Sequence, residues 1–146
     1  MAYTDARISK VRNYLYKIID NLVTDKKYEI NADWLGNIDS YSLDRLPNES
    51  KIPPDILGGR ICQDTYTLRT RKAYSSDIIN NLKNIGFFED FEKAIYSNNA
   101  KGIRPEIEGI QSIECLNSGS LNIENGTEAI FNIQIRIQYY VSEEAI

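Results

Sequence analysis

The clearest hydrophobic pattern of the chain lies near its C-terminus, at residues 131–140. Apolar and polar positions alternate there, with Phe131, Ile133, Ile135, Ile137 and Tyr139 on one face and Asn132, Gln134, Arg136, Gln138 and Tyr140 on the other. This period of two predicts a β-strand with one buried face. Upstream, Ile110, Ile113 and Cys115 predict another strand, which Ser118-Gly119-Ser120 bends. Asn125-Gly126 predicts a tight hairpin turn into the last strand.

Two segments carry apolar residues at helical spacing. The first, residues 5–24, has Thr4 or Asp5 as its N-cap and the apolar stripe Ile8, Val11, Leu15, Ile18 and Leu22. The second follows capping residues at 74–77 and carries the stripe Ile78, Ile79, Leu82, Ile85, Phe88, Phe91 and Ile95. Gly86 is a position where this helix can kink or split, and residues 98–102 predict its end.

The region between these helices has two different characters. Residues 60–72 predict a half-buried strand, with Cys62, Tyr66 and Leu68 on one face and Gln63, Thr65, Thr67, Arg69 and Arg71 on the other. Residues 26–54 show no sustained period, although they contain Trp34, Leu35, Ile38, Tyr41, Leu43 and Leu46. We interpret 26–54 as a long, arm-like excursion whose apolar residues either dock on a partner or wrap their own domain.

The order helix, strand, helix, strand, strand predicts a single α+β domain over residues 1–146. The expected sheet is antiparallel, has about four strands, and carries the N-terminal and central helices on one face. A content of 42% hydrophobic and 26% charged residues suits a folded globular protein. The chain has no apolar run of about 18 residues, so we expect no membrane span, and its charged N-terminus predicts no signal peptide.

The composition also limits the chemistry that we expect. The chain contains no histidine, which excludes Ser-His-Asp and Cys-His catalysis and every zinc site that uses histidine. It has no Walker loop, dinucleotide fingerprint, nucleophile elbow or Cys-x-x-Cys pair. Cys62 and Cys115 are too few for a disulfide framework, and we interpret them as reduced, apolar strand residues. The net charge of −4 opposes non-specific attraction to nucleic acid.

Three groups of charged residues remain as candidates for chemistry. Glu89, Asp90 and Glu92 could be offered as a metal cluster, but neighbouring helix positions point in different directions, which favours a solvated face. Asp64 could be a buried acid, although the sequence shows no partner for it. The run 69–72, Arg-Thr-Arg-Lys, could contact DNA phosphate or an acidic partner, or form a solvated strand end or an ion pair between protomers. We therefore predict no catalytic, cofactor-binding or metal-binding residues, and no enzyme activity.

Several short motifs in these elements resemble those of a known family. They are a glycine-led strand with an aromatic-x-Leu core at Gly59, Tyr66 and Leu68, a Tyr-Ser-x-Asp helix start at 74–77, a Gly-Phe-Phe-Glu helix centre at 86–89, and a final strand that ends at 137–140 with tyrosine. Over about residues 53–141 the chain resembles the small minor capsid or tail terminator proteins of tailed phages and prophages of low-GC Gram-positive bacteria, including the collar proteins of contractile phage-tail-like bacteriocins. It departs from the family pattern at Ala94-Ile95, where a tryptophan is usual, and at 103–107, where a Leu-Pro-x-Leu segment is usual.

The resemblance implies a tail-terminator-like fold and a structural protein without catalysis. Such a protein caps the head-proximal end of the tail as a homo-oligomeric ring, usually a hexamer, ends tube polymerisation and joins the tail to the neck. The implied partners are further copies of the chain, the tail tube protein, and sheath and neck proteins, with DNA passing through the channel without sequence-specific binding. The implied location is the head-proximal end of a virion or phage-tail-like particle assembled in the bacterial cytoplasm. The alternatives are a head-completion or connector protein and, from another class, a small α+β ligand-binding module or an enzyme that uses carboxylates alone.

Overall fold

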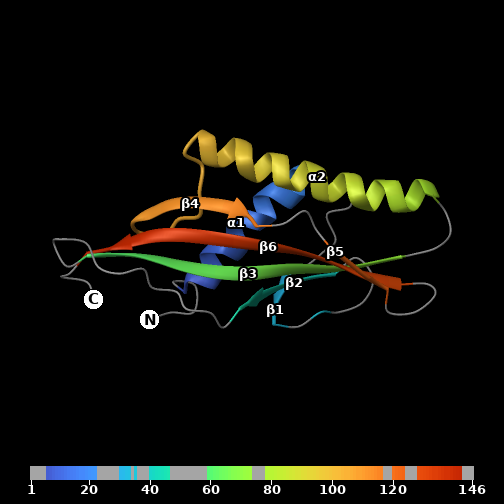
Figure 1. The fold of residues 1–146 in the computed structure, drawn as a ribbon, viewed down its shortest axis with the longest axis horizontal. Helices are drawn as coiled ribbons and strands as arrows, with labels where there is room; N and C mark the ends of the chain where they lie inside the picture. Colours follow the sequence, from blue (N-terminus) through green and yellow to red (C-terminus); the bar gives the residue numbers. More distant parts are fainter. Residues whose placement is uncertain are drawn as a thin grey trace.

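The computed structural model describes residues 6–22, 30–33, 35, 40–46, 59–73, 78–116, 120–123 and 128–142. Within these ranges the chain forms two helices and six strands (Figure 1). Their order is α1 (Arg7–Leu22), β1 (Ile30–Ala32), β2 (Tyr41–Arg45), β3 (Arg60–Ala73), α2 (Ile78–Ala100), β4 (Ile110–Cys115), β5 (Ser120–Ile123) and β6 (Glu128–Val141). This arrangement confirms the predicted α+β class.

The sheet differs in detail from the prediction of about four antiparallel strands. Its strand order over the described residues is β1-β2-β3-β6-β4, and β5 also pairs with β6. The β1–β2 pair is parallel and the other pairs are antiparallel, so the sheet is mixed. The two unpredicted strands are β1 and β2, which are only three and five residues long. Strands that short do not establish a recognisable period in the sequence.

The centre of the sheet is the pair of long strands β3 and β6, which lie side by side in Figure 1. Their antiparallel ladder joins fourteen residue pairs, from Arg60↔Val141 to Ala73↔Glu128. The predicted alternation of β6 is confirmed, because Phe131, Ile133, Ile135, Ile137 and Tyr139 are all buried. The predicted hairpin is confirmed as antiparallel pairing of β5 with β6, while its turn at Asn125-Gly126 lies outside the described residues.

Both helices cover the same face of this sheet. The α1 side chain Arg7 contacts Asp64 of β3, and the α2 ring of Phe88 stacks on Phe131 of β6 with centroids 5.4 Å apart. Asp64 and Phe131 belong to the buried face of their strands. On its inner side α1 buries Val11, Tyr14, Leu15, Ile18 and Ile19, so the predicted helix over 5–24 is confirmed with observed bounds Arg7–Leu22.

Helix α2 is continuous from Ile78 to Ala100, so Gly86 does not split it. The predicted end at 98–102 is confirmed: Gly102 has a φ of 78°, and the Ile103 amide donates to the Asn98 carbonyl at 2.8 Å. A glycine in this left-handed conformation commonly closes a helix in this way. One expectation for α2 is wrong, because Ile85 is 51% exposed instead of belonging to the buried stripe.

The segment 26–54 contributes to the core where the structure describes it. Ile30 of β1 and Tyr41 and Leu43 of β2 are buried, and β2 pairs with β3 along its whole length. Of the alternatives for this segment, wrapping of its own domain is the one that these residues support. Trp34, Ile38 and residues 47–54 lie outside the described parts. Neither described helix combines the length and the apolar character that crossing a membrane requires.

Candidate protein interface

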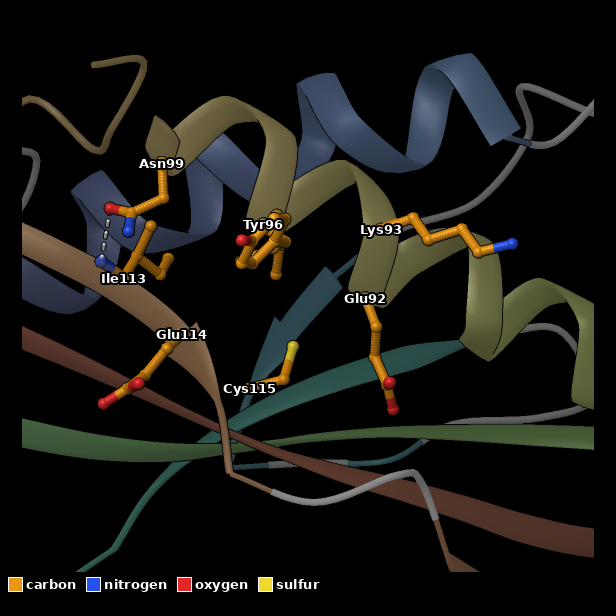
Figure 2. A pocket seen from close by; sticks show the side chains of 8 residues that line it. Glu92, Lys93, Tyr96, Asn99, Ile113, Glu114 and Cys115 are labelled. Atoms are coloured by element: carbon orange, nitrogen blue, oxygen red, sulfur yellow. Dashed lines mark hydrogen bonds between the residues drawn. The ribbon is translucent and has the colours of Figure 1, made fainter. Parts of the chain in front are cut away.

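A groove separates the C-terminal half of α2 from the edge strand β4 (Figure 2). We call it the α2–β4 groove; its volume is about 540 Å³, and it is lined by Glu92, Lys93, Ile95, Tyr96, Asn99, Ile113, Glu114 and Cys115. Asn99 anchors the helix end to the strand, because its side-chain oxygen accepts a hydrogen bond from the Ile113 amide at 3.2 Å. The same oxygen accepts from Arg104 Nε at 2.8 Å. The groove is therefore a fixed feature of the fold.

The chemistry of the α2–β4 groove is apolar and acidic. Figure 2 shows Glu92 reaching from α2 towards β4 near Cys115, whereas Lys93 points away. Burial, followed by the charges of Glu92 and Glu114, raises the pKa of the Cys115 thiol to about 12. A thiol that stays protonated is a poor nucleophile, so the groove offers binding surface instead of covalent chemistry. Both cysteines are free and lie in strands, as the sequence predicts.

The outer side of α2 carries exposed apolar residues next to carboxylates. Ile85, Glu89, Glu92 and Tyr96 follow one another at spacings of four, three and four, and we call this set the α2 stripe. Tyr96 is 79% exposed. Glu89 and Asp90 are exposed and Glu92 is half-buried, so only part of the predicted solvated face is fully solvated. Over the described ranges no three acidic or cysteine side chains are gathered closely enough to hold a metal ion.

A second hollow lies between α1 and the segment that follows α2. We call it the α1 groove; its volume is about 580 Å³, and it is lined by Lys10, Asn13, Tyr14, Tyr16, Lys17 and residues 102–106. Ile103 stands at this hollow with 52% of its surface exposed. Arg104 is fixed here, because its side chain donates to the Asn99 carbonyl at 2.9 Å. Lysine and arginine outnumber the single carboxylate, Glu106, so the α1 groove is basic.

Asp64 is a buried acid whose carboxylate has several partners. The sequence offered Asp64 as a buried acid but showed no partner for it. Its carboxylate is 1% exposed, and Arg7 Nε donates to Oδ2 at 2.6 Å. Arg45 Nη2 lies 3.5 Å from Oδ1, and the Tyr66 hydroxyl donates to Oδ2 at 3.2 Å. The partners come from α1, from the end of β2 and from the next inward position of β3. Burial, and then the negative charge of Asp64, raises the pKa of Tyr66 far above its ordinary value.

This Asp64 cluster is better suited to anchoring than to catalysis. The guanidinium of Arg7 also lies over the Tyr139 ring, 4.8 Å from its centroid, which adds a cation–π contact. The carboxylate is closed in by its own neighbours, and both of its arginines come from other elements of the same chain. The cluster therefore ties the start of α1 and the end of β2 to the centre of the sheet.

Two residues of the basic run 69–72, Arg69 and Thr70, make contacts that hold the sheet together. Arg69 forms an ion pair with Asp44 across β2 and β3, and buried Thr70 donates a hydrogen bond to the Ser40 carbonyl at 2.9 Å. Arg69 is therefore paired within its own chain, whereas the sequence offered DNA, an acidic partner, solvent or another protomer as contacts of the run. The side chain of Lys72 lies outside the described residues.

Sequence reasoning missed the features that distinguish this surface. The exposed residues Ile85 and Tyr96 are apolar and at helical spacing, so the sequence does not separate them from core residues. Leu116, after β4, is also exposed, at 40%.

Comparison with known proteins gave no match: neither the protein-family models nor the curated proteins include one for this chain.

Proposed function

We propose that this protein is a structural subunit of a terminator or collar ring. The ring caps the head-proximal end of a phage or phage-tail-like particle, ends tube polymerisation and joins the tail to the neck. The observation that carries the proposal is a set of exposed apolar residues at several places: Ile85 and Tyr96 on α2, Ile103 after α2 and Leu116 after β4 are each at least 40% exposed. Apolar surface of this kind suits a subunit that meets neighbours on more than one side.

The motif residues behind the family resemblance support this proposal through their packing. Tyr66 and Leu68 are buried in the core. Gly59 faces the ring of Tyr140, and a side chain at position 59 would overlap the atoms of that ring. The glycine that leads β3 and the tyrosine that ends β6 are thus a contacting pair, which gives this part of the motif a physical reason. The ring function itself comes with the resemblance.

The charge of the chain is compatible with a channel for DNA. Its net charge of −4 gives subunits that repel phosphate, so DNA can slide through the ring without being held. Within the basic run 69–72, the charge of Arg69 is neutralised by Asp44.

The experiment that tests the proposal is electron cryomicroscopy of particles from the producing strain. We expect a symmetric ring of this chain, with six copies, at the head-proximal end of the tube. The absence of such a ring, or a single copy of the chain at the baseplate, would contradict the proposal. A ring one layer higher, against the portal, would favour the head-completion or connector alternative. Gene order gives an independent check, because a terminator gene should immediately precede the sheath and tube genes.

A ligand-binding module is the second candidate, and the two grooves favour it. Their volumes, about 540 and 580 Å³, fall within the range of small-molecule sites. A ligand soak distinguishes the candidates: a small molecule that raises the melting temperature of the monomer, together with particles that lack the ring, would favour the module.

A further inference from the structure

The α2 stripe lies on the outer side of its helix, and only Glu92 among its four residues is half-buried. Position 85 lies about 60° around the helix from Phe88, on the side away from Phe91, because successive residues turn by about 100°. Tyr96 and the two glutamates share that side. The stripe therefore points beside the sheet instead of onto it, and its two apolar ends, Ile85 and Tyr96, are 51% and 79% exposed.

The structure shows no ion pair of Glu89 or Glu92 with any residue that it describes. Lys93 follows Glu89 at a spacing of four, and it points away from Glu92 (Figure 2). Burial and then the charge of Glu89 raise the pKa of Glu92. Like charges three residues apart on a helix repel each other, so a cation placed next to this pair would be favourable.

The α1 groove offers the complementary surface. Lys10 and Lys17 lie two helical turns apart along its wall, and neither forms an ion pair within the described parts of the chain. The interval of seven residues is about 10 Å along a helix, more than twice the interval from Glu89 to Glu92, so the two lysines can flank that pair of carboxylates. Ile103 adds an exposed apolar contact at the same hollow. A basic groove with an apolar side fits an acidic stripe with an apolar ring.

We infer that the α2 stripe of one copy docks in the α1 groove of a second copy. Tyr96 packs against Ile103 of the second copy, and Glu89 and Glu92 face Lys10 and Lys17. The two surfaces differ, so the contact is head-to-tail and repeats from copy to copy until the rotation closes it. The docking names the contact within the proposed ring, and only the closure of the ring rests on the proposed function.

Charge reversal tests this docking, because the two surfaces can be inverted separately. The Glu89→Lys/Glu92→Lys variant has two basic surfaces, and the Lys10→Glu/Lys17→Glu variant has two acidic ones. Sedimentation velocity at low salt should show self-association of the parent and a loss of at least about tenfold in association constant for each variant alone. An equimolar mixture of the two variants should recover association, because each then presents an inverted partner to the other.

A matched control separates docking from net charge. Asp90→Lys changes the charge by the same amount as Glu89→Lys, at an exposed neighbouring position outside the α2 stripe. It should leave association unchanged. Equal losses for Asp90→Lys and Glu89→Lys, a mixture that stays dissociated, or a parent that is monomeric at its highest soluble concentration would each overturn the docking.

Particles distinguish a failure of the docking from a failure of the proposed function. If particles that carry Glu89→Lys/Glu92→Lys keep their head-proximal ring, the docking is overturned and the proposed function stands. If the mixture recovers association while parent particles show no ring of this chain, the docking stands and the proposed function is wrong.

Discussion

The two helices lie on the same sheet face but use their apolar residues differently. On α1 every described apolar side chain is buried or half-buried, and the outer side is polar. On α2, Phe88, Phe91 and Ile95 are buried while Ile85 and Tyr96 are exposed. A helix that only covers a sheet needs one apolar face. The difference is that α1 is apolar only on the side that covers the sheet, whereas α2 carries apolar residues on its outer side as well.

The helices are also fastened by different contacts. The start of α1 is held by a charge-assisted hydrogen bond, from Arg7 to the buried Asp64. The end of α2 is held through Asn99, which accepts a neutral hydrogen bond from the Ile113 amide and charge-assisted ones from Arg104. The anchor of α1 is thus centred on a buried carboxylate and that of α2 on a neutral amide. Substitutions in the sheet under both helices, on the two faces of α2 and in the Asp64 cluster should separate these roles.

The largest effect is expected where both helices share their support. Ile133 is fully buried in β6, so Ile133→Asp places an unpaired carboxylate in the core at a cost of several kcal/mol. That cost approaches the total stability of a small domain, about 5–15 kcal/mol, and the variant should not fold. Circular dichroism and thermal melting check this. Gln134→Asp, on the outer face, should fold and melt close to the parent, and the reverse order would contradict the observed faces of β6.

The inner and outer faces of α2 should differ next. Phe91 is fully buried, so Phe91→Ala should cost about 3–5 kcal/mol of unfolding free energy. Tyr96 is 79% exposed, so Tyr96→Ala should change stability by no more than about 0.5 kcal/mol. Urea unfolding of both variants measures the two values. Equal losses would mean that Tyr96 belongs to the core and that the contrast between the two helices is false.

Two variants of the Asp64 cluster, which anchors α1, should differ in their loss of stability. The Arg7→Met/Arg45→Met variant leaves the buried Asp64 carboxylate without its two cations and with the hydrogen bond from the Tyr66 hydroxyl, which should cost about 3–5 kcal/mol. Asp64→Asn leaves two arginines that already reach solvent, and it should cost only about 1–3 kcal/mol. Urea unfolding should therefore place the double arginine variant below Asp64→Asn. A larger loss for Asp64→Asn would show that the carboxylate is not the desolvated partner.

A small gain is expected at Gly86 in α2. A methyl group added there meets nothing within 4 Å, and the helix is continuous through this position. Gly86→Ala should therefore stabilise the protein by about 0.5–1 kcal/mol through helix propensity and a less flexible unfolded chain. Thermal melting measures the gain. A lower melting temperature would indicate that the helix needs glycine here.

At neutral pH the thiol beneath α2 should contribute least, because its effect on stability appears only in alkaline solution. In the folded protein the pKa of Cys115 is about 12, raised from 9.0, so the thiol ionises at lower pH in the unfolded chain. Its contribution to stability is present below pH 9 and is lost as the pH rises from 9 towards 12. Urea unfolding across this interval should show a shallower loss for Cys115→Ala than for the parent. Parallel profiles would mean that the thiol is not shielded in the α2–β4 groove.

The sequence predicts those helices and strands whose apolar residues recur at a regular spacing. Apolar and polar residues alternate over 131–140 in β6, and α1 has one apolar stripe. The position and the buried face of both elements could therefore be predicted correctly. β2 could not, because Tyr41 and Leu43 are its only two buried apolar positions and Ser42 between them is buried as well. In so short a strand, buried residues on both faces erase the alternation.

The candidate interface and the Asp64 cluster were hidden for a different reason. Asp64 and Arg7 are 57 residues apart, and only the fold brings them together. Ile85 differs from its buried neighbours by its angle around the helix, which depends on where the sheet lies. Properties that arise from distant contacts or from orientation leave no local pattern in the sequence.

The ladder between β3 and β6 has a mechanical consequence. Its fourteen residue pairs run along the long axis of the molecule in Figure 1, and antiparallel hydrogen bonds stand perpendicular to the strands. Tension that pulls the two strands lengthwise against each other loads these bonds in shear, so they must yield together. Tension that peels one strand away from an end breaks them one after another. The molecule should therefore resist stretching along β6 far better than unzipping from the Glu128 end, and its lifetime under load depends on the direction of the force.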